Sequence, residues 1–457
     1  MMVDEKMEIY ESLLKLDKMI VSSFHVLPIQ NIKAIKSENY YDKYKKLMEN
    51  LYIFEKTITQ PFFDSLVLPS NQMKKSMEVA SQIFNSDATL FTTAGSTISN
   101  QIVINSLSKK SRVLVQKSVH QSIHFSLQNY NIYHNYINEE IICNERFLTQ
   151  ISSNHLNEII QNEYDTLIIN SQSYEGLMLD MEPFLNFVFN NNKWIKNVII
   201  DEAWGGWTFF NKEMRHKSAP YIARKLNEKF GVNFVVIQSA HKSFFSLRQA
   251  GLIHVYGDEL FLKNIRDSHF KLHTTSPSYP ILASTELGIL YARDHGEWHS
   301  INACNLSQQL RNFIKNNTEI FEVDDVFFKN GLYFNDPNKV WIKSNLLTGK
   351  ELREILFDQY GVYLSRYTKN HVLINFHYGV TEACLDALTS ALSQIEKNTL
   401  SHNFSLNENE LSEYFVIPYP PGVPFIFPGQ KISKNDINNI KKHKDEKNTL
   451  IYIKEVI

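Results

Sequence analysis

The two stretches that decide the fold are Asn197-Val-Ile-Ile-Asp201-Glu-Ala-Trp-Gly-Gly206 and Asn233-Phe-Val-Val-Ile-Gln-Ser-Ala-His-Lys242. Each contains a short apolar run, rich in β-branched residues, that stops at charged or polar residues. Such runs are typical of parallel strands that are buried on both faces and that deliver the following side chains to the carboxyl edge of a sheet. We therefore expect Asp201 and Lys242 to lie at the same edge of one sheet.

The sequence around these stretches alternates between strand and helix signals from about residue 88 to 300. The strand candidates are Ala88–Thr92, Arg112–Gln116, Thr166–Ile169, Val198–Ile200, Phe234–Ile237 and Leu252–Val255. Helical stretches fall between several of them. This pattern predicts an α/β fold, a three-layer sandwich with a mostly parallel sheet.

The flanking regions have a different texture, and we predict three parts: residues 1–85, 86–315 and 316–457. The first part is mainly helical, with a helix over Gln72–Phe84 for which Asn71 is the expected N-cap. The third part is a smaller α+β domain. Its expected elements are strands over Lys339–Lys343 and Val372–Phe376, helices over Gly349–Gln359 and Thr381–Lys397, a loop over 398–412, and an extended, proline-rich turn over Val416–Pro424.

Composition limits the possible functions. The formal charge of the 457 residues is −2 and no basic cluster stands out, which argues against a general nucleic-acid role. The three cysteines form no CxxC pair, so neither a disulfide framework nor a structural zinc site is expected. The first twenty residues lack the pattern of a signal peptide, and no apolar run is long enough to span a membrane. We expect a cytoplasmic protein.

A lysine and an aspartate presented at one sheet edge are what pyridoxal phosphate chemistry needs. The lysine forms a Schiff base, and the aspartate keeps the pyridine nitrogen protonated so that the ring accepts electrons. On this interpretation Asp201 binds the pyridinium, Ala203 lies under the ring and Trp204 packs beside it. The alternative is that Asp201 only caps the helix that follows it.

Further polar residues could complete such a site. Gly95 permits a tight turn after a strand, and Ser96 and Thr97 offer hydroxyls and amides at a helix N-terminus, where a phosphate binds. The alternative is an ordinary helix cap. Ser239, His241 and Lys242 form a second polar cluster that could serve phosphate and imine together.

His120 also follows a strand candidate and could stack on a flat cofactor. It could equally be a histidine that begins a helix. Together with His124, four residues later, it could form half of a metal site, but no third ligand is evident, so no metal is expected.

In a series of short motifs the chain resembles the fold-type-I pyridoxal phosphate enzymes of the ornithine/lysine/arginine decarboxylase family. The matching stretches, in order, are Gly95-Ser-Thr97, Val119-His-Gln-Ser122, Ser173-Tyr-Glu-Gly176, Asp201-Glu-Ala-Trp204, Ser239-Ala-His-Lys242, Gln249–Val255, His273–Tyr279, Leu347–Glu351, and Tyr419–Pro424 with Pro428-Gly429. The resemblance covers about residues 80 to 455.

The resemblance implies a role for each matching position. Lys242 would be the Schiff-base lysine, Asp201 the partner of the pyridinium, and His120 the residue that stacks on the ring. The phosphate would be held by Ser96, Thr97, Ser239 and His241, and the motif that begins at Ser173 would also line the cofactor site. Ser276 of a second subunit would complete the phosphate site, which implies at least a homodimer with shared active sites.

The chain departs from the family pattern on the substrate side. Members usually carry a His-x-Pro-Gly-His-Lys-like segment near the N-terminus. The nearest stretch here, Phe24-His-Val-Leu-Pro-Ile-Gln30, lacks the Gly-His-Lys part, and Ser171 replaces the asparagine usual before the Ser-Tyr-Glu-Gly motif. The cofactor site is therefore expected to be intact and the substrate site altered.

We expect pyridoxal phosphate-dependent decarboxylation of an amino acid, which releases the amine and carbon dioxide. A basic substrate (arginine, lysine or ornithine) follows from the resemblance alone. One alternative keeps the cofactor but changes the reaction to transamination, oxidative deamination or another biosynthetic step. The other is a non-catalytic homologue that binds a partner, although such a protein has no reason to keep Lys242, Asp201, His120 and the phosphate hydroxyls together.

Overall fold

A seven-stranded sheet forms the centre of the structure, a computed structural model in which residues 7–56, 64–146, 148–152, 155–156, 159–160, 163–326, 331–403, 409–419, 422–445 and 449–454 are described. In spatial order its strands are β2 (Ala88–Thr92), β11 (Gly251–Tyr256), β10 (Asn233–Gln238), β9 (Asn197–Asp201), β7 (Thr166–Asn170), β3 (Arg112–Gln116) and β4 (Tyr133–Ile137). Only β11 pairs antiparallel with its neighbours. The six expected strands are confirmed, four of them one or two residues longer than predicted.

Both faces of the sheet are buried, as the apolar strands require. Along β9, Ile199 packs in one core whereas Val198 and Ile200 pack in the other. This alternation follows from the two-residue period of a strand, which sends neighbouring side chains to opposite faces. A run that is apolar at every position must therefore be covered by helices on both sides, which gives the three-layer sandwich.

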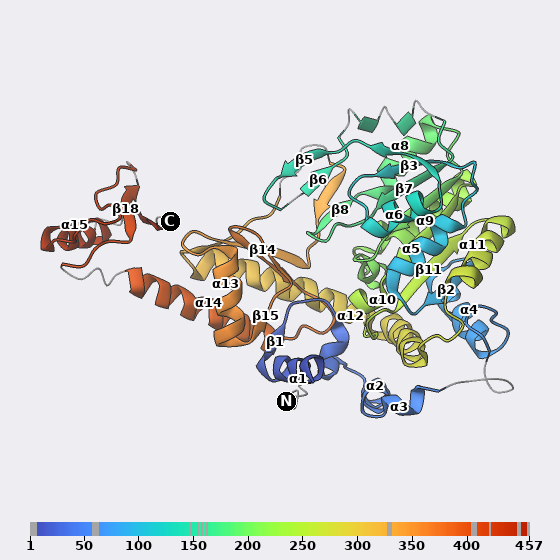
Figure 1. Cartoon of the computed structure of the whole chain (residues 1–457), viewed down its shortest axis with the longest axis horizontal. Coiled ribbons are helices and arrows are strands. Elements are labelled where there is room, and N and C mark those ends of the chain that lie inside the picture. The colour runs from blue at the N-terminus through green and yellow to red at the C-terminus, as the bar shows by residue number, and fades with distance from the viewer. Residues whose placement is uncertain are drawn as a thin grey trace, which may run out of the picture.

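Helices form the two outer layers (Figure 1). The first layer contains α4 (Gln72–Phe84), α5 (Gly95–Asn105), α6 (Gln121–Asn129), α11 (Glu259–Leu272) and α12 (Tyr279–Asn317), and the second contains α8 (Met181–Asn191) and α9 (Ala219–Phe230). Shorter elements of this region are α10 (Ala240–Ser243), η2 (Gly206–Phe210), η3 (Arg215–Lys217), the hairpin of β5 (Glu140–Cys143) and β6 (Leu148–Gln150), and β8 (Leu177–Leu179), which pairs with β13 (Tyr333–Asn335).

The predicted helix over residues 72–84 is confirmed, but its predicted cap is wrong. The side chain of Asn71 makes no capping hydrogen bond. The carboxylate of Asp64 accepts instead from the backbone N–H groups of Ser70, Asn71 and Met73, at 2.6, 2.7 and 2.8 Å. The turn between Asp64 and the helix brings this carboxylate over the helix N-terminus, and its negative charge suits the unpaired N–H groups there better than an amide does.

The smaller domain contains an antiparallel sheet in the order β12 (Phe321–Val323), β14 (Lys339–Ser344), β17 (His371–Asn375) and β16 (Arg366–Tyr367). Helices α13 (Gly349–Tyr360) and α14 (Glu382–Asn403) pack on it. The strands and helices predicted here are confirmed, except that α14 continues through the first six residues of the expected loop over 398–412. The division of the chain into three parts stays a prediction.

The N-terminal residues join the smaller domain. After α1 (Glu8–Met19), strand β1 (Ser22–Ser23) pairs in parallel with β15 (Val362–Tyr363), and the fully buried Phe24 belongs to the core of the smaller domain. The chain then runs through η1 (Pro28–Ala34), α2 (Glu38–Glu49) and α3 (Leu51–Phe54).

The C-terminal elements lie at the end of the molecule opposite the large sheet (Figure 1). They are β18 (Tyr414–Tyr419), α15 (Lys434–Asp445) and β19 (Thr449–Lys454), and the two strands pair antiparallel. The extended structure expected from Val416 is confirmed as far as Tyr419, and residues 420–421 lie outside the described part of the chain. Within the described ranges, no helix combines the length and apolar character needed to cross a bilayer.

Candidate active site

The carboxyl ends of three neighbouring parallel strands bring the candidate residues together. In the sheet register Asp201, the last residue of β9, pairs with Asn170 of β7 on one side and with Ile237 of β10 on the other. The chain leaves β10 through Ser239 and turns at once into α10, which carries His241 and Lys242. The expectation that Asp201 and Lys242 share one sheet edge is confirmed.

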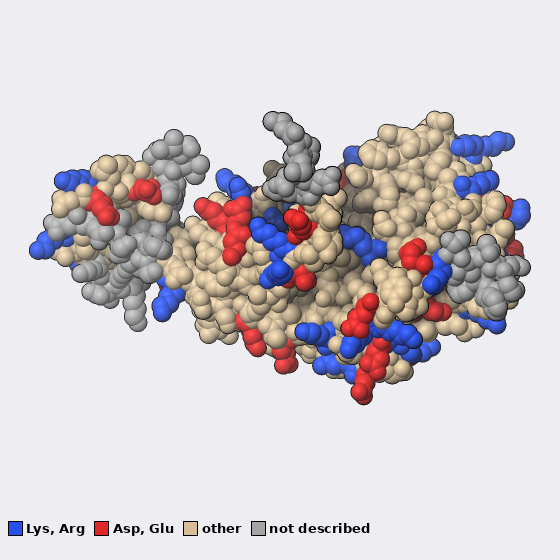
Figure 2. Space-filling model, turned by 60° about the horizontal axis from the view of Figure 1, so that its bottom comes forward, with Lys and Arg blue, Asp and Glu red and all other residues tan. Residues whose placement is uncertain are grey.

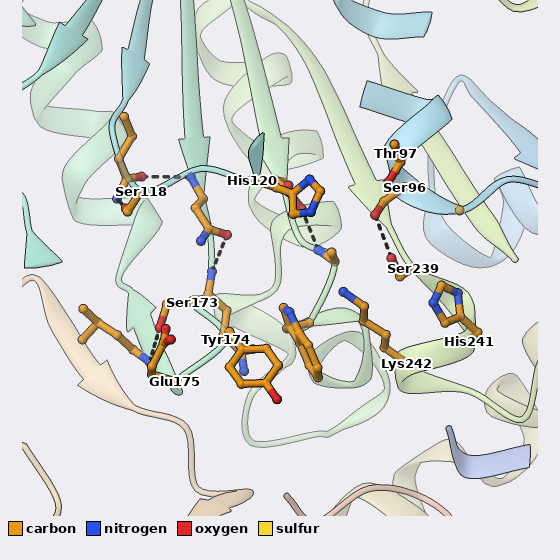
Figure 3. A pocket seen from close by; sticks show the side chains of 18 of the residues that line it. Ser96, Thr97, Ser118, His120, Ser173, Tyr174, Glu175, Ser239, His241 and Lys242 are labelled. Atoms are coloured by element: carbon orange, nitrogen blue, oxygen red, sulfur yellow. Dashed lines mark hydrogen bonds between the residues drawn. The ribbon is translucent and has the colours of Figure 1, made fainter. Parts of the chain in front are cut away.

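A cavity of about 610 Å³ opens at this edge. The predicted site residues that line it are Gly95, Ser96, Thr97, His120, Ser173, Asp201, Ala203, Trp204, Ser239, His241 and Lys242. Ser276 is exposed and is not among the lining residues of this chain. Figure 3 shows that Ser96, Thr97, Ser239 and His241 gather on one side of the cavity and that Ser173, Tyr174 and Glu175 lie on the other, with Lys242 between them.

The serine side of the cavity has the features of an anion site. Gly95 begins α5 with a φ of +70°, the left-handed conformation that favours glycine, and its N–H donates to the carbonyl of Gln249 at 2.7 Å. Ser96 and Thr97, the next residues of α5, also line the cavity, at the helix end where the first-turn N–H groups have no partner within the helix. Ser239 donates to the hydroxyl of Ser96 at 2.9 Å, which ties the two polar clusters together.

Lys242 extends into the cavity, and its Nζ lies 4.2 Å from the centre of the Trp204 ring. Burial lowers the pKa of Lys242, while the negative charge of Asp201 opposes this shift. Only the neutral amine of a lysine is a nucleophile, so a lowered pKa favours condensation with an aldehyde.

Asp201 is 3% exposed, and its Oδ1 accepts a hydrogen bond from the N–H of Ala203 at 3.0 Å. The carboxylate therefore holds the turn that follows β9, but it does not cap the next helix as the alternative expected, because η2 has its N-cap at Gly205 and no capping side chain. Asp201 also lines the same cavity as Lys242.

His120 begins a helix, as one of its two predicted roles requires, and it also lines the cavity. It is the N-cap of α6, because its Nδ1 accepts from the N–H of Ser122 at 3.2 Å, and the Ser122 hydroxyl lies 2.8 Å from the same nitrogen. Asn100 donates to that hydroxyl at 2.9 Å, which leaves the hydroxyl hydrogen to point at His120. An accepting Nδ1 places the ring proton of a neutral imidazole on Nε2. Burial lowers the pKa of His120, which favours this neutral form. The nearby His124 forms a hydrogen bond through its Nε2 with the carbonyl oxygen of Lys117, at 3.2 Å.

Sequence reasoning missed several residues at or behind the cavity. The loop that carries Ser173 is attached to the smaller domain: Arg366 forms an ion pair with Glu175, and Trp341 Nε1 donates to the Glu175 carbonyl at 2.8 Å. Lys339 is almost fully buried beside Trp204. These partners lie more than 160 residues from the loop in sequence, and no local pattern marks them.

Glu202 is a second buried carboxyl group that the sequence did not single out for a role. Its Oε1 accepts from the N–H of Ala219 and its Oε2 from Nε2 of Gln238, both at 2.7 Å. Burial raises the pKa of Glu202 to about 7, although the two hydrogen bonds work in the opposite direction.

The donor set fits pyridoxal phosphate. A helix N-terminus with Ser96, Thr97 and Ser239 offers donors for a phosphate, Lys242 offers an amine for an aldehyde, and Asp201 offers a buried carboxylate for a protonated ring nitrogen. Close packing supports this cradle: a Cβ at Gly251 would lie 2.4 Å from Thr92 Oγ1 and 2.9 Å from the backbone of Gly95.

Comparisons with known proteins show which proteins the chain is similar to. Over 98% of both lengths the chain is 22% identical to the uncharacterized protein YaaO of Bacillus subtilis, and over 83% of this chain and 82% of the relative it is 22% identical to an arginine decarboxylase of Bacillus anthracis. Among solved structures, the constitutive lysine decarboxylase of Escherichia coli matches with a TM-score of 0.66 and 18% identity, covering 90% of this chain and 73% of that one. This structural likeness shows fold type I.

A family model described as the major domain of Orn/Lys/Arg decarboxylases matches residues 9–380, most of the chain. The chain therefore belongs to the Orn/Lys/Arg decarboxylase family, a family of carboxy-lyases that act on amino acids.

Proposed function

We propose that the chain binds pyridoxal 5'-phosphate through a Schiff base with Lys242 and removes the α-carboxylate of a basic amino acid (arginine, lysine or ornithine). The observation that carries the proposal is the meeting of Lys242, Asp201 and the N-terminus of α5 around one cavity. The family and the curated arginine and lysine decarboxylases among its relatives support a basic substrate.

When bound, pyridoxal phosphate supplies an electron sink for the pair of electrons that the departing carboxylate leaves behind. Asp201 holds a proton at the pyridine nitrogen, and its burial among apolar strands excludes water from that contact. His120 would cover the ring, and its contacts with Ser122 keep the imidazole in the Nε2–H form. Ser96, Thr97, Ser239 and His241 hold the phosphate, so that the reacting groups keep one orientation.

The residues that line the cavity support a basic substrate less directly than the family does. Glu175 and Asp201 are the carboxylates among the lining residues, and Arg366 already pairs with Glu175. None of the lining residues comes from the Phe24–Gln30 segment, where the family motif is incomplete. The absence of this segment from the lining residues favours a second candidate function, which is another reaction with the same cofactor, such as an amino transfer or an oxidative deamination.

We also propose a homodimer in which Ser276 of one subunit reaches the phosphate of the other. Ser276 lies in the exposed turn between α11 and α12, outside the cavity of its own chain. That position suits a residue that serves a neighbouring site.

Two measurements test the function. Protein reconstituted with pyridoxal phosphate should show the visible absorption of an imine, and Lys242→Ala should lose it; identical spectra would refute the Schiff base at this position. Arginine, lysine and ornithine, followed by a wider set of amino acids, are then supplied while carbon dioxide and amine are measured together. Release of both in equal amounts supports decarboxylation, whereas a keto acid without carbon dioxide supports the alternative.

A further inference from the structure

An arginine to which the proposed function gives no role lies at the cavity. Arg248 follows Lys242 by six residues, in the turn that leads from α10 to β11, and it lines the cavity of about 610 Å³. Its side chain is exposed, and none of the ion pairs in the described part of the chain involves it. An exposed arginine is ordinary on a protein surface, so its role has to be argued from the turn that carries it.

The turn that carries Arg248 is fixed and strained. The N–H of Ala250 donates to the carbonyl of Leu247 at 3.2 Å, which closes a four-residue turn with Arg248 as its second residue. The N–H of Leu247 donates to the hydroxyl of Ser284 in α12 at 3.0 Å. Gln249, the third residue of the turn, has a φ of +74°. This left-handed conformation is costly for a residue with a side chain, and such strain is concentrated at ligand-binding and catalytic sites.

The strained turn packs against the end of α5 where the phosphate is proposed to bind. The carbonyl of Gln249 accepts from the N–H of Gly95, the first residue of α5, at 2.7 Å. The carbonyl of Ala250 accepts from Nδ1 of His241 at 2.9 Å. Gln249 is therefore held in its left-handed conformation by a contact with the phosphate side of the cavity, and Arg248 precedes it directly in the chain.

The groups so far assigned to the phosphate supply no fixed positive charge. Ser96, Thr97 and Ser239 offer neutral hydroxyls. The pKa of His241 falls to about 4, chiefly through burial and in part through the positive charge of Arg248, so the ring is neutral near pH 7. Because its Nδ1 carries the proton that is donated to a carbonyl, Nε2 of the neutral ring has no proton to donate to an anion.

A phosphate monoester carries between one and two negative charges near pH 7, and a guanidinium group is charged at every pH of interest. We propose that Arg248 binds the phosphate of pyridoxal 5'-phosphate and balances its charge, from a strained turn that packs on the N-terminus of α5. This inference rests on the proposed function, in which the phosphate lies at that helix end. Charge-assisted hydrogen bonds from a guanidinium group are stronger than those from hydroxyls, so Arg248 supplies affinity while the serines fix orientation.

The test compares two aldehydes that differ only in the phosphate group. Binding of pyridoxal 5'-phosphate and of pyridoxal to the full-length protein, prepared without cofactor, is measured by fluorescence titration in wild type, Arg248→Gln and Arg248→Lys. Arg248→Gln should weaken the affinity for pyridoxal 5'-phosphate by about 10- to 100-fold and leave the affinity for pyridoxal unchanged, because a charge-assisted hydrogen bond is lost only where a phosphate is present. Arg248→Lys keeps the charge without the planar fork and should lie between wild type and Arg248→Gln.

Arg353→Gln is the matched control. Burial lowers the pKa of His25, and the positive charges of Arg248 and Arg353 lower it further, so both arginines lie near this histidine. Arg353 is not among the lining residues of the cavity, and its replacement should leave both affinities unchanged. The circular dichroism spectrum of each variant checks that the fold is kept.

A second measurement needs no imine. Inorganic phosphate, added at constant ionic strength, should raise the thermal midpoint of wild type and Arg353→Gln and should raise that of Arg248→Gln less. Equal weakening of both aldehydes in Arg248→Gln overturns the proposal, because the arginine would then act on another part of the ligand or on the fold. Unchanged affinity for both aldehydes also overturns it. A response to inorganic phosphate that depends on Arg248, in a protein that shows no imine absorption, supports the anion site and contradicts only the proposed function.

Discussion

Burial of the Glu202 carboxyl group should make the protein less stable at neutral and alkaline pH. The pKa of Glu202 rises from an ordinary 4.5 to about 7 on folding. Between these values the folded chain binds the proton more tightly than the unfolded chain, so the free energy of unfolding falls as the pH rises. The 2.5-unit difference, at 1.36 kcal/mol per unit, amounts to a loss of about 3 kcal/mol above pH 7. Below pH 4.5 both states are protonated and the loss disappears.

Glu202→Gln removes this titration while keeping nearly the same shape. The amide oxygen can still accept from the Ala219 N–H, although the amide nitrogen meets Nε2 of Gln238 as a second donor. This mismatch lowers the free energy of unfolding of the variant by an amount that does not depend on pH. We therefore expect the free energy of unfolding of the variant, relative to wild type, to rise by about 3 kcal/mol between pH 4.5 and pH 8.

Urea unfolding at half-unit pH intervals, followed by far-UV circular dichroism, measures this difference. Glu228→Gln removes a carboxylate from the exposed side of α9 and serves as the control, with an expected effect within about 0.5 kcal/mol at every pH. If the difference between Glu202→Gln and wild type is the same at pH 4.5 and pH 8, the buried carboxyl group does not titrate as the structure implies, and the reasoning fails.

Four other changes have outcomes that the structure predicts. Asp201→Asn should retain bound pyridoxal phosphate but lose turnover by on the order of a hundredfold or more, measured as carbon dioxide release; near-normal turnover would mean that this residue only holds the turn after β9. Asp64→Ala removes the acceptor for the first N–H groups of α4 and should cost about 1–2 kcal/mol in urea unfolding. Gly251→Ala should displace the first turn of α5, because the new Cβ would meet the backbone of Gly95. We expect weaker binding of pyridoxal phosphate in a fluorescence titration and an unchanged circular dichroism spectrum. Ser276→Ala subunits mixed with Lys242→Ala subunits should regain activity if sites are shared, and verified heterodimers without recovery would contradict the proposed dimer.

Six of the seven strands of the large sheet could be predicted from the sequence because each contains an apolar run, whereas the edge strand β4, with its polar and exposed residues, was missed. A run such as Asn197–Asp201 must be buried on both faces, which is typical of parallel strands covered by helices on both sides. The same runs end at Asp201 and lead to Lys242, so the centre of the site followed from the strand ends. The residues at 95–97 and 239–241, where α5 and α10 begin, followed because each set succeeds a strand at that same edge.

The rest of the site could not be predicted because it depends on contacts between distant parts of the chain. Lys339 and Arg366 come from the smaller domain, and nothing in the surrounding sequence indicates that one is buried or that the other pairs with Glu175. Sequence rules for helix capping consider only the residue directly before the helix. They therefore miss Asp64, which reaches the N-terminus of α4 across a turn. Local patterns predict strands and their ends, whereas the partners of single polar side chains are set by tertiary packing.

The parallel pairing of β1 with β15 has a consequence for the order of events during translation. Ser22 and Ser23 leave the ribosome early, but their partners Val362 and Tyr363 are synthesised 340 positions later in the chain. At about 5 to 20 residues per second, roughly 20 to 70 seconds separate the two events. Until synthesis passes residue 363, Ser22 and Ser23 have no partner strand, and Phe24 has no complete domain core to enter.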